Sequence, residues 1–366
     1  MKHLLRFILC LGYTAFCLIV SAQAKKSKSN ISVIAYYAGD SAHIDAYPIE
    51  KLTHIIYSFT HLKGNEMSVA NKKDSATIKH LVSLKKRNPG LKIILSMGGW
   101  GGCGPCSEVF STDKGRQDFA QSVLRTSEYF GTNGVDLDWE YPAISGFPGH
   151  RFVPEDKANF TVLLKALRDV LGHKYEISFA AGGFTTFLQQ SIEWDKIVPY
   201  VDKVNLMTYD LVHGFSKVTG HHTPLYSTPG QIESVDHAVK YLDSIHFPKN
   251  KLVIGAAFYA RIFDVDIDAN KGLYQPGKFD HGFDFKNANG DSLEKLGFTF
   301  YWDDIAKAPY AYSPAKKQVI TFDDRRSLAL KTEYAIANGL NGIMFWELGN
   351  DKTQDGLLDA IYNATK

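Results

Sequence analysis

The feature that most constrains this chain is the run of residues 133–142, NGVDLDWEYP, in which three acids alternate with apolar residues. Side chains of a β-strand alternate between its faces, so Asp136, Asp138 and Glu140 would share one face at a spacing of roughly 7 Å. Burial and like-charge neighbours both raise the pKa of a carboxyl group, so this arrangement is costly. Such clusters are typical of sites that hold a proton near neutral pH.

An exposed strand with a solvated acidic face is the alternative interpretation of this run. Gly134 and Pro142 mark a short strand with defined ends. The intervening Val135, Leu137 and Trp139 suit a strand whose other face is also packed. The pattern therefore favours a buried strand with acids on its inner face.

Short β-rich segments alternate with segments of helical spacing along the rest of the chain. Besides the acidic run, the expected strands are residues 31–37, 52–59, 91–95, 177–181, 204–209, 252–259 and 341–346. The expected helices are residues 75–86, 117–129, 154–171, 234–244 and 327–338. This alternation predicts βα units around a parallel sheet. Eight such units in 366 residues predict an α/β fold, the (β/α)8 TIM barrel.

The interval between the seventh and eighth expected strands is too long for a simple crossover. Within it, residues 297–302 and 318–322 have the composition of strands, and residues 302–306 that of a short helical turn. We therefore expect a small α+β insertion between strands 7 and 8, at about residues 262–326.

Polar and aromatic residues gather where the expected strands end. In barrels of this kind, active sites form at the carboxyl ends of the strands. Besides the three acids, these ends carry Tyr36, Tyr37, Tyr57, Phe59, Gly98, Gly99, Trp100, Tyr141, Met207, Tyr209, Asp210, Arg261, Trp346 and Glu347. The sequence therefore predicts a site at this end of the barrel.

The acidic run resembles the DGxDxDxE signature of glycoside hydrolase family 18, the chitinases and their relatives. Asp136, Asp138 and Glu140 match the three acids of that signature. Asn133 stands where the family most often has Asp, a position outside the three catalytic acids.

Further motifs follow in the order of that family. Residues 96–99 (SMGG) resemble its SxGG motif, residues 207–210 (MTYD) its MxYD motif, and residues 322–324 (FDD) its YDD run. Residues 255–261 (GAAFYAR) depart from the usual GxPxYGR, although Arg261 is retained. The ordered set of motifs, rather than any one of them, carries the resemblance.

The resemblance implies hydrolysis with retention, assisted by the substrate's own 2-acetamido group. Glu140 would be the general acid, Asp138 would bind the acetamido N–H, and Tyr209 would hold the acetamido oxygen. Asp136 would share a proton with Asp138, and Asp210 would help to bind the sugar. The expected substrate-binding residues are Tyr36, Phe59, Gly98, Gly99, Trp100, Tyr141, Met207, Arg261 and Trp346. No metal or organic cofactor is needed.

Three functions remain open at this point. The first is a chitinase that hydrolyses β-1,4 bonds between N-acetylglucosamine units. The second is an endo-β-N-acetylglucosaminidase that cuts the chitobiose core of N-glycans, and the third is a non-catalytic chitin-binding lectin. Lectins of this family usually lose the glutamate or its neighbours, whereas Glu140, Asp138 and Tyr209 are all present. The insertion favours a deep cleft and hence a chitinase, by analogy with the family.

The partners we expect are chitin or N-acetylglucosamine oligosaccharides. A net charge of +2 favours neither nucleic acid nor an acidic partner. Aromatic residues make up 13% of the chain, which is compatible with stacking on the CH faces of sugars. We expect the protein to act as a monomer.

Residues 1–24 have the pattern of a secretory signal peptide. A basic start precedes an apolar run that is too short to span a bilayer comfortably, and residues 22–24 form an A-x-A site. We expect cleavage before Lys25, a catalytic domain of residues 25–366, and export to the periplasm or the extracellular space without a membrane anchor.

Cys103 and Cys106 are the cysteines that follow this segment. In an exported protein, a disulfide that closes their loop is the leading hypothesis. A zinc site would need two further ligands, and a thioredoxin-like role would require a helix that begins at the first cysteine. Isolated histidines such as His54, His61 and His213 are interpreted as packed or surface groups rather than as ligands.

Overall fold

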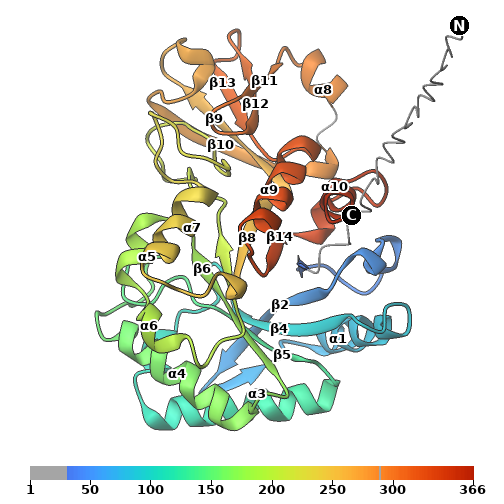
Figure 1. Ribbon diagram of the computed structural model, residues 1–366, viewed down its shortest axis with the longest axis vertical. Coiled ribbons are helices and arrows are strands. Elements are labelled where there is room, and N and C mark those ends of the chain that lie inside the picture. Colours follow the sequence, from blue (N-terminus) through green and yellow to red (C-terminus); the bar gives the residue numbers. More distant parts are fainter. Residues whose placement is uncertain (1–30, 288–289) are drawn as a thin grey trace, which may run out of the picture.

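The computed structural model describes residues 31–287 and 290–366, so the expected signal peptide at residues 1–24 lies outside the described residues. Figure 1 shows the strands of one sheet in the middle of the molecule, helices around them, and a second, smaller sheet at the upper end of the view. The chain thus forms a helix-covered central sheet that carries a second sheet at one end.

Eight parallel strands form a closed sheet. Their spatial order is β1 (Ser32–Tyr37), β14 (Gly342–Trp346), β8 (Leu252–Ala257), β7 (Lys203–Met207), β6 (Glu176–Gly182), β5 (Gly134–Asp138), β4 (Lys92–Gly98) and β2 (His54–Lys63). β2 pairs with β1 on its other side, which closes the ring, and the short β3 (Glu66–Ser68) extends β2 as an antiparallel hairpin. The predicted (β/α)8 barrel is confirmed.

Helices cover the outer face of the barrel. The longer ones are α1 (Lys72–Ser83), α3 (Asp113–Phe130), α4 (Asp156–Leu171), α7 (Val235–Ser244), α9 (Arg325–Ala337) and α10 (Leu357–Ala364). The shorter ones are α2 (Cys106–Val109), α5 (Thr185–Gln190), α6 (Trp194–Ile197) and α8 (Gly290–Lys295). Among residues 31–287 and 290–366, no helix has the length and apolar composition needed to cross a membrane.

Short 3-10 helices lie in the connections, at Ile44–Ala46, Ile49–Lys51, Leu84–Lys86, Lys249–Lys251, Asn270–Gly272, Phe285–Asn287 and Leu348–Asn350. Four of the longer helices begin at a polar cap whose side chain accepts an N–H three residues later: Asn71, Thr112, Ser234 and Asp324. These caps satisfy N–H groups that a helix cannot pair internally.

One helix starts earlier than its periodicity indicates. The sequence predicts a helix over 117–129, whereas α3 begins at Asp113. Its first turn, residues 113–116, is polar and carries no apolar spacing. The Thr112 cap, rather than the apolar pattern, sets the boundary.

Between β8 and α9 the chain builds a five-stranded antiparallel sheet. Its spatial order is β10 (Gly277–Asp284), β9 (Tyr259–Val265), β13 (Gln318–Thr321), β12 (Ala308–Ser313) and β11 (Thr299–Asp303). Figure 1 places these strands together above the barrel. The sequence indicates only the two strands labelled β11 and β13. The segments of β10 and β12 carry Gly or Pro, and β9 follows directly on the strand expected at residues 252–259.

The helical turn expected at residues 302–306 is wrong. Trp302 and Asp303 complete β11, and a turn leads directly into β12. The Asp303 carboxylate accepts the N–H groups of Ile305 and Ala306 at 2.9 and 3.0 Å. An Asp side chain that bonds the backbone two residues on favours a tight turn over a helix.

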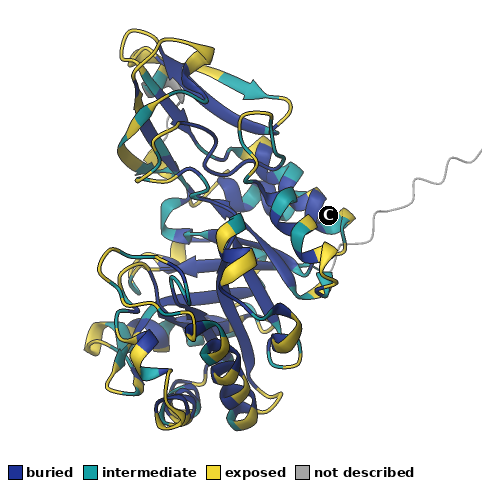
Figure 2. Cartoon of the chain, turned by 90° about the vertical axis from the view of Figure 1, so that its left-hand side faces the viewer, coloured by how far each residue is buried: buried dark blue, intermediate teal, exposed yellow. Residues whose placement is uncertain are grey.

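The barrel strands separate two apolar cores. Val135 and Leu137 of β5 belong to the large core between strands and helices. Asp136 lies on the opposite face, where it contacts Tyr36 of the small core inside the barrel. Figure 2 shows the strands as the buried part of the molecule, with exposed residues on the loops and on the outer sides of the helices. The acids of the run therefore face the interior of the barrel.

A fully buried ion pair joins α9 to the segment between β13 and α9. Lys331 Nζ lies 2.7 Å from Asp323 Oδ2, and both side chains are 0% exposed. Asp323 also accepts from the Ala257 N–H at 3.1 Å, from Thr223 Oγ1 at 3.2 Å and from Ser327 Oγ at 2.6 Å. Its carboxylate is thus bonded on every side.

Replacing Lys331 by Met should destabilise the fold strongly. The variant leaves a buried carboxylate without its cation, which costs roughly 3–5 kcal/mol of the free energy of unfolding. Urea unfolding followed by circular dichroism measures the change.

The matched control is Lys240→Met, which removes a cation that is 74% exposed and pairs with Asp236. An exposed pair contributes at most about 1 kcal/mol. Similar losses in the two variants would contradict the structural role of the buried pair.

Candidate active site

Asp136 is the deepest acid of the run and is bonded by four donors. Its Oδ2 accepts from Ser96 Oγ at 2.8 Å and from Tyr36 OH at 3.1 Å. Its Oδ1 accepts from Ser178 Oγ at 2.6 Å and from Asn205 Nδ2 at 3.1 Å. Burial raises the pKa of Asp136 above its ordinary value, and these hydrogen bonds oppose that shift because they stabilise the carboxylate.

Asp138 lies above Asp136 and is 4% exposed. Burial, and then the charges of Glu140 and Asp136, raise its pKa well above the ordinary value. Among the described residues its Oδ1 atom is fully buried and has no hydrogen-bond partner. Burial and the neighbouring charges therefore favour the protonated form of Asp138, and its Oδ1 has no partner among the described residues.

Glu140 stands at the mouth of the barrel and is partly exposed. Desolvation raises its pKa to about 7; a hydrogen bond from Tyr141 opposes the shift and the charge of Asp210 adds to it. A carboxyl group with a pKa near 7 is protonated in a large fraction of molecules at neutral pH. Such a group can donate a proton and take one back.

Asp210 is held as a carboxylate beside these acids. Arg261 donates from Nε to Asp210 Oδ1 and from Nη2 to Oδ2, both at 2.5 Å, and His222 Nδ1 lies 3.5 Å from Oδ1. Burial raises the pKa of Asp210, but hydrogen bonds and charge from His222 and Arg261 outweigh burial and lower it well below the usual range. The site therefore combines a carboxylate that is paired with Arg261 and two acids, Asp138 and Glu140, whose pKa values are raised.

His221 and His222 lie side by side in the loop after β7 and face different partners. His221 Nε2 is 3.1 Å from Asp303 Oδ2 on β11, in the inserted sheet. His222 is fully buried against Asp210 and packs 5.2 Å from the Tyr259 ring. One dipeptide thus contacts both the inserted sheet and an acid of the site.

Aromatic rings form the floor of the mouth. Trp346 lies 5.9 Å from the Tyr36 ring and stacks on Phe59 at 5.6 Å with an angle of 17° between the planes. Met207 and Tyr209 belong to the same interior core. Burial raises the pKa of Tyr209 well above its ordinary value, so its hydroxyl stays protonated and can donate a hydrogen bond.

The Gly98–Gly99 pair brings the end of β4 against β5. The Gly99 N–H donates to the Asp138 carbonyl at 2.9 Å. A Cβ on Gly98 would lie 2.2 Å from that same carbonyl oxygen, and both glycines have positive φ, 116° and 86°. Only glycine fits here, and the pair turns the chain toward Trp100, which is 50% exposed.

The structure thus gathers the predicted site residues at one end of the barrel: Tyr36, Phe59, Gly98, Gly99, Trp100, Asp136, Asp138, Glu140, Tyr141, Met207, Tyr209, Asp210, Arg261 and Trp346. Tyr37 and Tyr57 belong instead to the outer core between strands and helices. Glu347 accepts N–H groups of Ala38 and Gly349 at 3.0 and 3.2 Å, so it ties β14 to the loop after β1.

Three polar residues of the site escaped sequence analysis. Asn205 and Ser178 stand in predicted strands, and a period of two would have placed each on the interior face. His222 carries no such signal, because it lies in a long loop whose path the sequence does not fix.

The loop after β4 also holds a disulfide between Cys103 and Cys106, and α2 begins at the second of these residues. In the parts of the chain that the structure describes, no group of three or more His, Cys, Asp or Glu side chains has an arrangement that could hold a metal ion.

Comparison with known proteins shows the family to which this chain is related. The family described as "Glycosyl hydrolases family 18" matches residues 32–351. Chitinase A1 of Niallia circulans is 37% identical over 305 residues, which are 76% of this chain and 43% of that protein. Chitinase 1 of Aphanocladium album is 29% identical over 86% of this chain and 79% of its own length. The chain thus spans less than half of the first relative and about four fifths of the second.

Solved structures with the same fold support this family relationship. A family 18 N-acetylglucosaminidase from Paenibacillus barengoltzii superposes with a TM-score of 0.85 at 38% identity, over 92% of this chain and 100% of that one. Chitinase ChiA74 from Bacillus thuringiensis gives a TM-score of 0.85 at 26% identity, over 92% of this chain and 70% of that one. The protein belongs to the glycosyl hydrolases family 18 and is a glycoside hydrolase of the chitinase type.

Proposed function

We propose that this protein hydrolyses β-1,4 bonds between N-acetylglucosamine units, as a secreted chitinase that retains the anomeric configuration. The single observation that carries the proposal is the row of acids Asp136, Asp138 and Glu140, which leads from the buried interior of the barrel to its partly exposed mouth, where the pKa of Glu140 is raised to about 7. The names of the relatives support the substrate class. Export rests on the pattern of residues 1–24, and action as a monomer remains an expectation.

In the first step, Glu140 donates its proton to the glycosidic oxygen as the bond to C1 breaks. The oxygen of the substrate's own 2-acetamido group forms the new bond to C1, which gives an oxazolinium ion. Glu140, now a carboxylate, then takes a proton from water as the water oxygen attacks C1 and the bond from C1 to the acetamido oxygen breaks, which restores the acetamido group. Two displacements at C1 retain its configuration, so the first product is the β-anomer.

Asp138 and Tyr209 are placed to steer the acetamido group. The unpaired Oδ1 of Asp138 can accept the acetamido N–H, which favours the cyclised intermediate. The neutral Tyr209 hydroxyl can donate to the acetamido oxygen. Asp136 is adjacent and can take up a share of the Asp138 proton when charge develops on the substrate.

A second candidate is release of single N-acetylglucosamine units, favoured by the likeness to the Paenibacillus barengoltzii N-acetylglucosaminidase, which this chain matches over that structure's whole length. Cleavage of the N-glycan core is a third use of the same machinery. The presence of Glu140, Asp138 and Tyr209 argues against a lectin.

Product analysis separates these candidates. Purified protein is incubated with N-acetylglucosamine oligosaccharides, and the products and their anomers are followed by NMR. Release of β-anomeric oligosaccharides supports a chitinase, and release of the monosaccharide alone supports the second candidate. Cleavage of a high-mannose glycopeptide without action on the oligosaccharides would overturn the proposal.

Replacing Glu140 by Gln should lower kcat/KM on chitin oligosaccharides by about 10²–10⁴-fold, because the amide cannot donate the proton. Calorimetric binding of the oligosaccharides should persist. The matched control is Glu155→Gln, which changes an exposed glutamate of the same loop and should leave the rate unchanged. A fully active Glu140→Gln variant would exclude Glu140 as the acid.

The pH profile should report the same group. Because Glu140 acts in its protonated form, kcat/KM should fall as pH rises through about 7. Asp210→Asn removes a negative charge that raises the pKa of Glu140, so the alkaline limb should move to lower pH. Initial rates between pH 4 and pH 9, an interval set about the pKa of interest, measure the alkaline limb of the wild type and of Asp210→Asn. A limb that stays fixed or moves upward would contradict the assignment.

A further inference from the structure

A continuous line of apolar groups leads from the floor of the site to the loop after β4. Trp346 stacks on Phe59, and the Phe59 ring lies against Gly99, since a Cβ on Gly99 would sit 2.6 Å from that ring. Trp100 is the next residue, and half of it is exposed. The mouth therefore has a second flat apolar surface beside its floor.

The loop that carries Trp100 does not fix this side chain by itself. Five of the seven residues 98–104 are glycine, and Gly98, Gly99 and Gly101 all have positive φ. Glycine has the greatest backbone freedom of any residue, so a loop of this composition is not ordered by its own preferences. Contacts with the rest of the molecule must hold Trp100 in place.

The first constraint on the loop is the Cys103–Cys106 disulfide at the end of the glycine run. Both cysteines are buried, at 2% and 0% exposure, and belong to the core between strands and helices. A cross-link that closes so short a loop constrains the unfolded chain little. Its main effect is local, because it fixes the end of the loop to the start of α2.

The second constraint is Phe147, in the loop between β5 and α4. Its ring lies edge-on to Trp100 with centroids 5.5 Å apart, and 3.1 Å from the position of a Cβ on Gly101. The His150 ring also packs against Phe147, with the two ring centroids 4.8 Å apart. The Phe147 N–H donates to the Glu140 carbonyl at 3.4 Å, so one residue contacts both Trp100 and the backbone of the acid.

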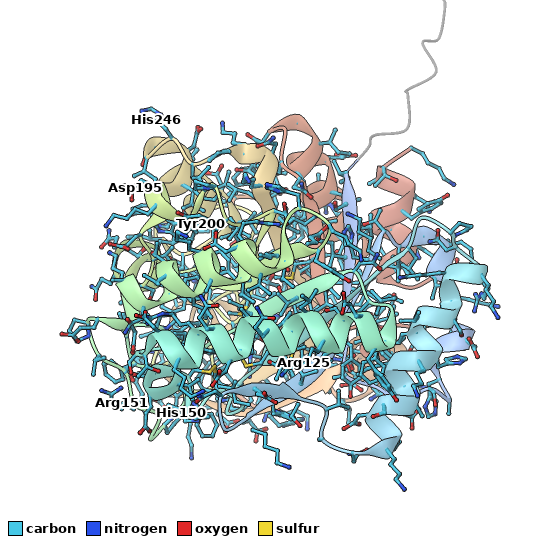
Figure 3. The ribbon with its side chains drawn as sticks, turned by 90° about the horizontal axis from the view of Figure 1, so that it is seen from below. Arg125, His150, Arg151, Asp195, Tyr200 and His246 are labelled. Carbon is cyan, nitrogen blue, oxygen red and sulfur yellow. A yellow bond between two sulfur atoms is a disulfide. The ribbon has the colours of Figure 1, made fainter. Side chains whose placement is uncertain are left out.

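The two loops are also joined beneath these rings. Arg151 Nη1 donates to Ser107 Oγ at 2.7 Å, and Ser107 Oγ donates to Asp156 Oδ1 at 2.9 Å. Ser107 and Asp156 are both fully buried. Figure 3 shows His150 and Arg151 next to each other at the edge of the barrel, beside the paired helices α3 and α4. The loops after β4 and β5 thus form one unit.

Trp100 is among the substrate-binding residues that the family resemblance implies. We propose that Phe147 and the Cys103–Cys106 disulfide are positioning groups for it, which hold its ring where a sugar adjacent to the one beside Glu140 can stack. The inference rests on the proposed hydrolysis of N-acetylglucosamine chains. A sugar presents an apolar CH face that fits a fixed indole ring, and a mobile indole would lose contact with it. The benefit therefore exists only for substrates long enough to reach Trp100.

The test is Phe147→Ala, assayed on N-acetylglucosamine oligosaccharides from the dimer to the hexamer. We expect kcat/KM on the longest substrates to fall roughly tenfold, mainly through KM, because one aromatic pair contact is lost. The shortest cleaved substrate should change less than about twofold. Phe152→Ala is the matched control, since it removes an exposed ring of the same loop and should change neither value.

A double-mutant cycle separates positioning from direct contact. If Phe147 acts through Trp100, the variant Phe147→Ala/Trp100→Ala should be no weaker than Trp100→Ala alone. The double variant Cys103→Ser/Cys106→Ser should show the same dependence on length, and it keeps the test open if Phe147→Ala folds poorly. Additive losses, or equal losses at every length, would overturn the proposal.

A binding measurement tests the positioning role of Phe147 independently of the proposed hydrolysis. If wild-type protein cleaves none of the oligosaccharides, the proposed function fails, and calorimetry with the hexamer still decides the inference. A roughly tenfold weaker affinity of Phe147→Ala would support it, as would be expected from the loss of one aromatic pair. An unchanged affinity would overturn it.

Discussion

The hydrogen bonding of Asp136 is the constraint on which the rest of the site depends. One buried carboxylate accepts donors from four strands of the barrel: Tyr36 on β1, Ser96 on β4, Ser178 on β6 and Asn205 on β7. A buried acceptor that lost one of these donors would cost free energy, so the strands are held at matching heights. Asp138 follows on the same strand, and Glu140 comes two residues after that strand ends, so the alignment of the strands also sets the positions of these two acids.

The four acids of the site differ in the direction or cause of their pKa shifts because their surroundings differ. Asp136 is stabilised by neutral donors, Asp138 is buried between charges with an unpaired oxygen, and Glu140 stands nearer solvent with a pKa of about 7. Asp210 is kept ionised by Arg261. Carboxyl groups of one kind thus differ in pKa within a single site, which is how acid and base roles are separated at one pH.

Much of this was predictable from sequence, because the relevant signals are periodic. The alternation of acids with Val135, Leu137 and Trp139 fixes which side chains face inward, and eight βα units fix the barrel. The remainder depends on loops and on contacts across strands. His222 meets Asp210, and Phe147 meets Trp100, only after the fold has brought distant segments together. The helical turn predicted at residues 302–306 does not form, because the Asp303 side chain bonds the backbone and favours a tight turn.

The adjacent residues His221 and His222 have a consequence for how this molecule can be divided. His221 contacts Asp303 in the inserted sheet, while His222 contacts Asp210 in the barrel. Both histidines lie in the loop after β7, outside the inserted segment, so the inserted sheet is not structurally independent of the barrel. A chimera that exchanges only the inserted segment would separate His221 from its carboxylate and disturb the neighbour of Asp210. An exchange of that sheet between proteins must therefore include the loop after β7.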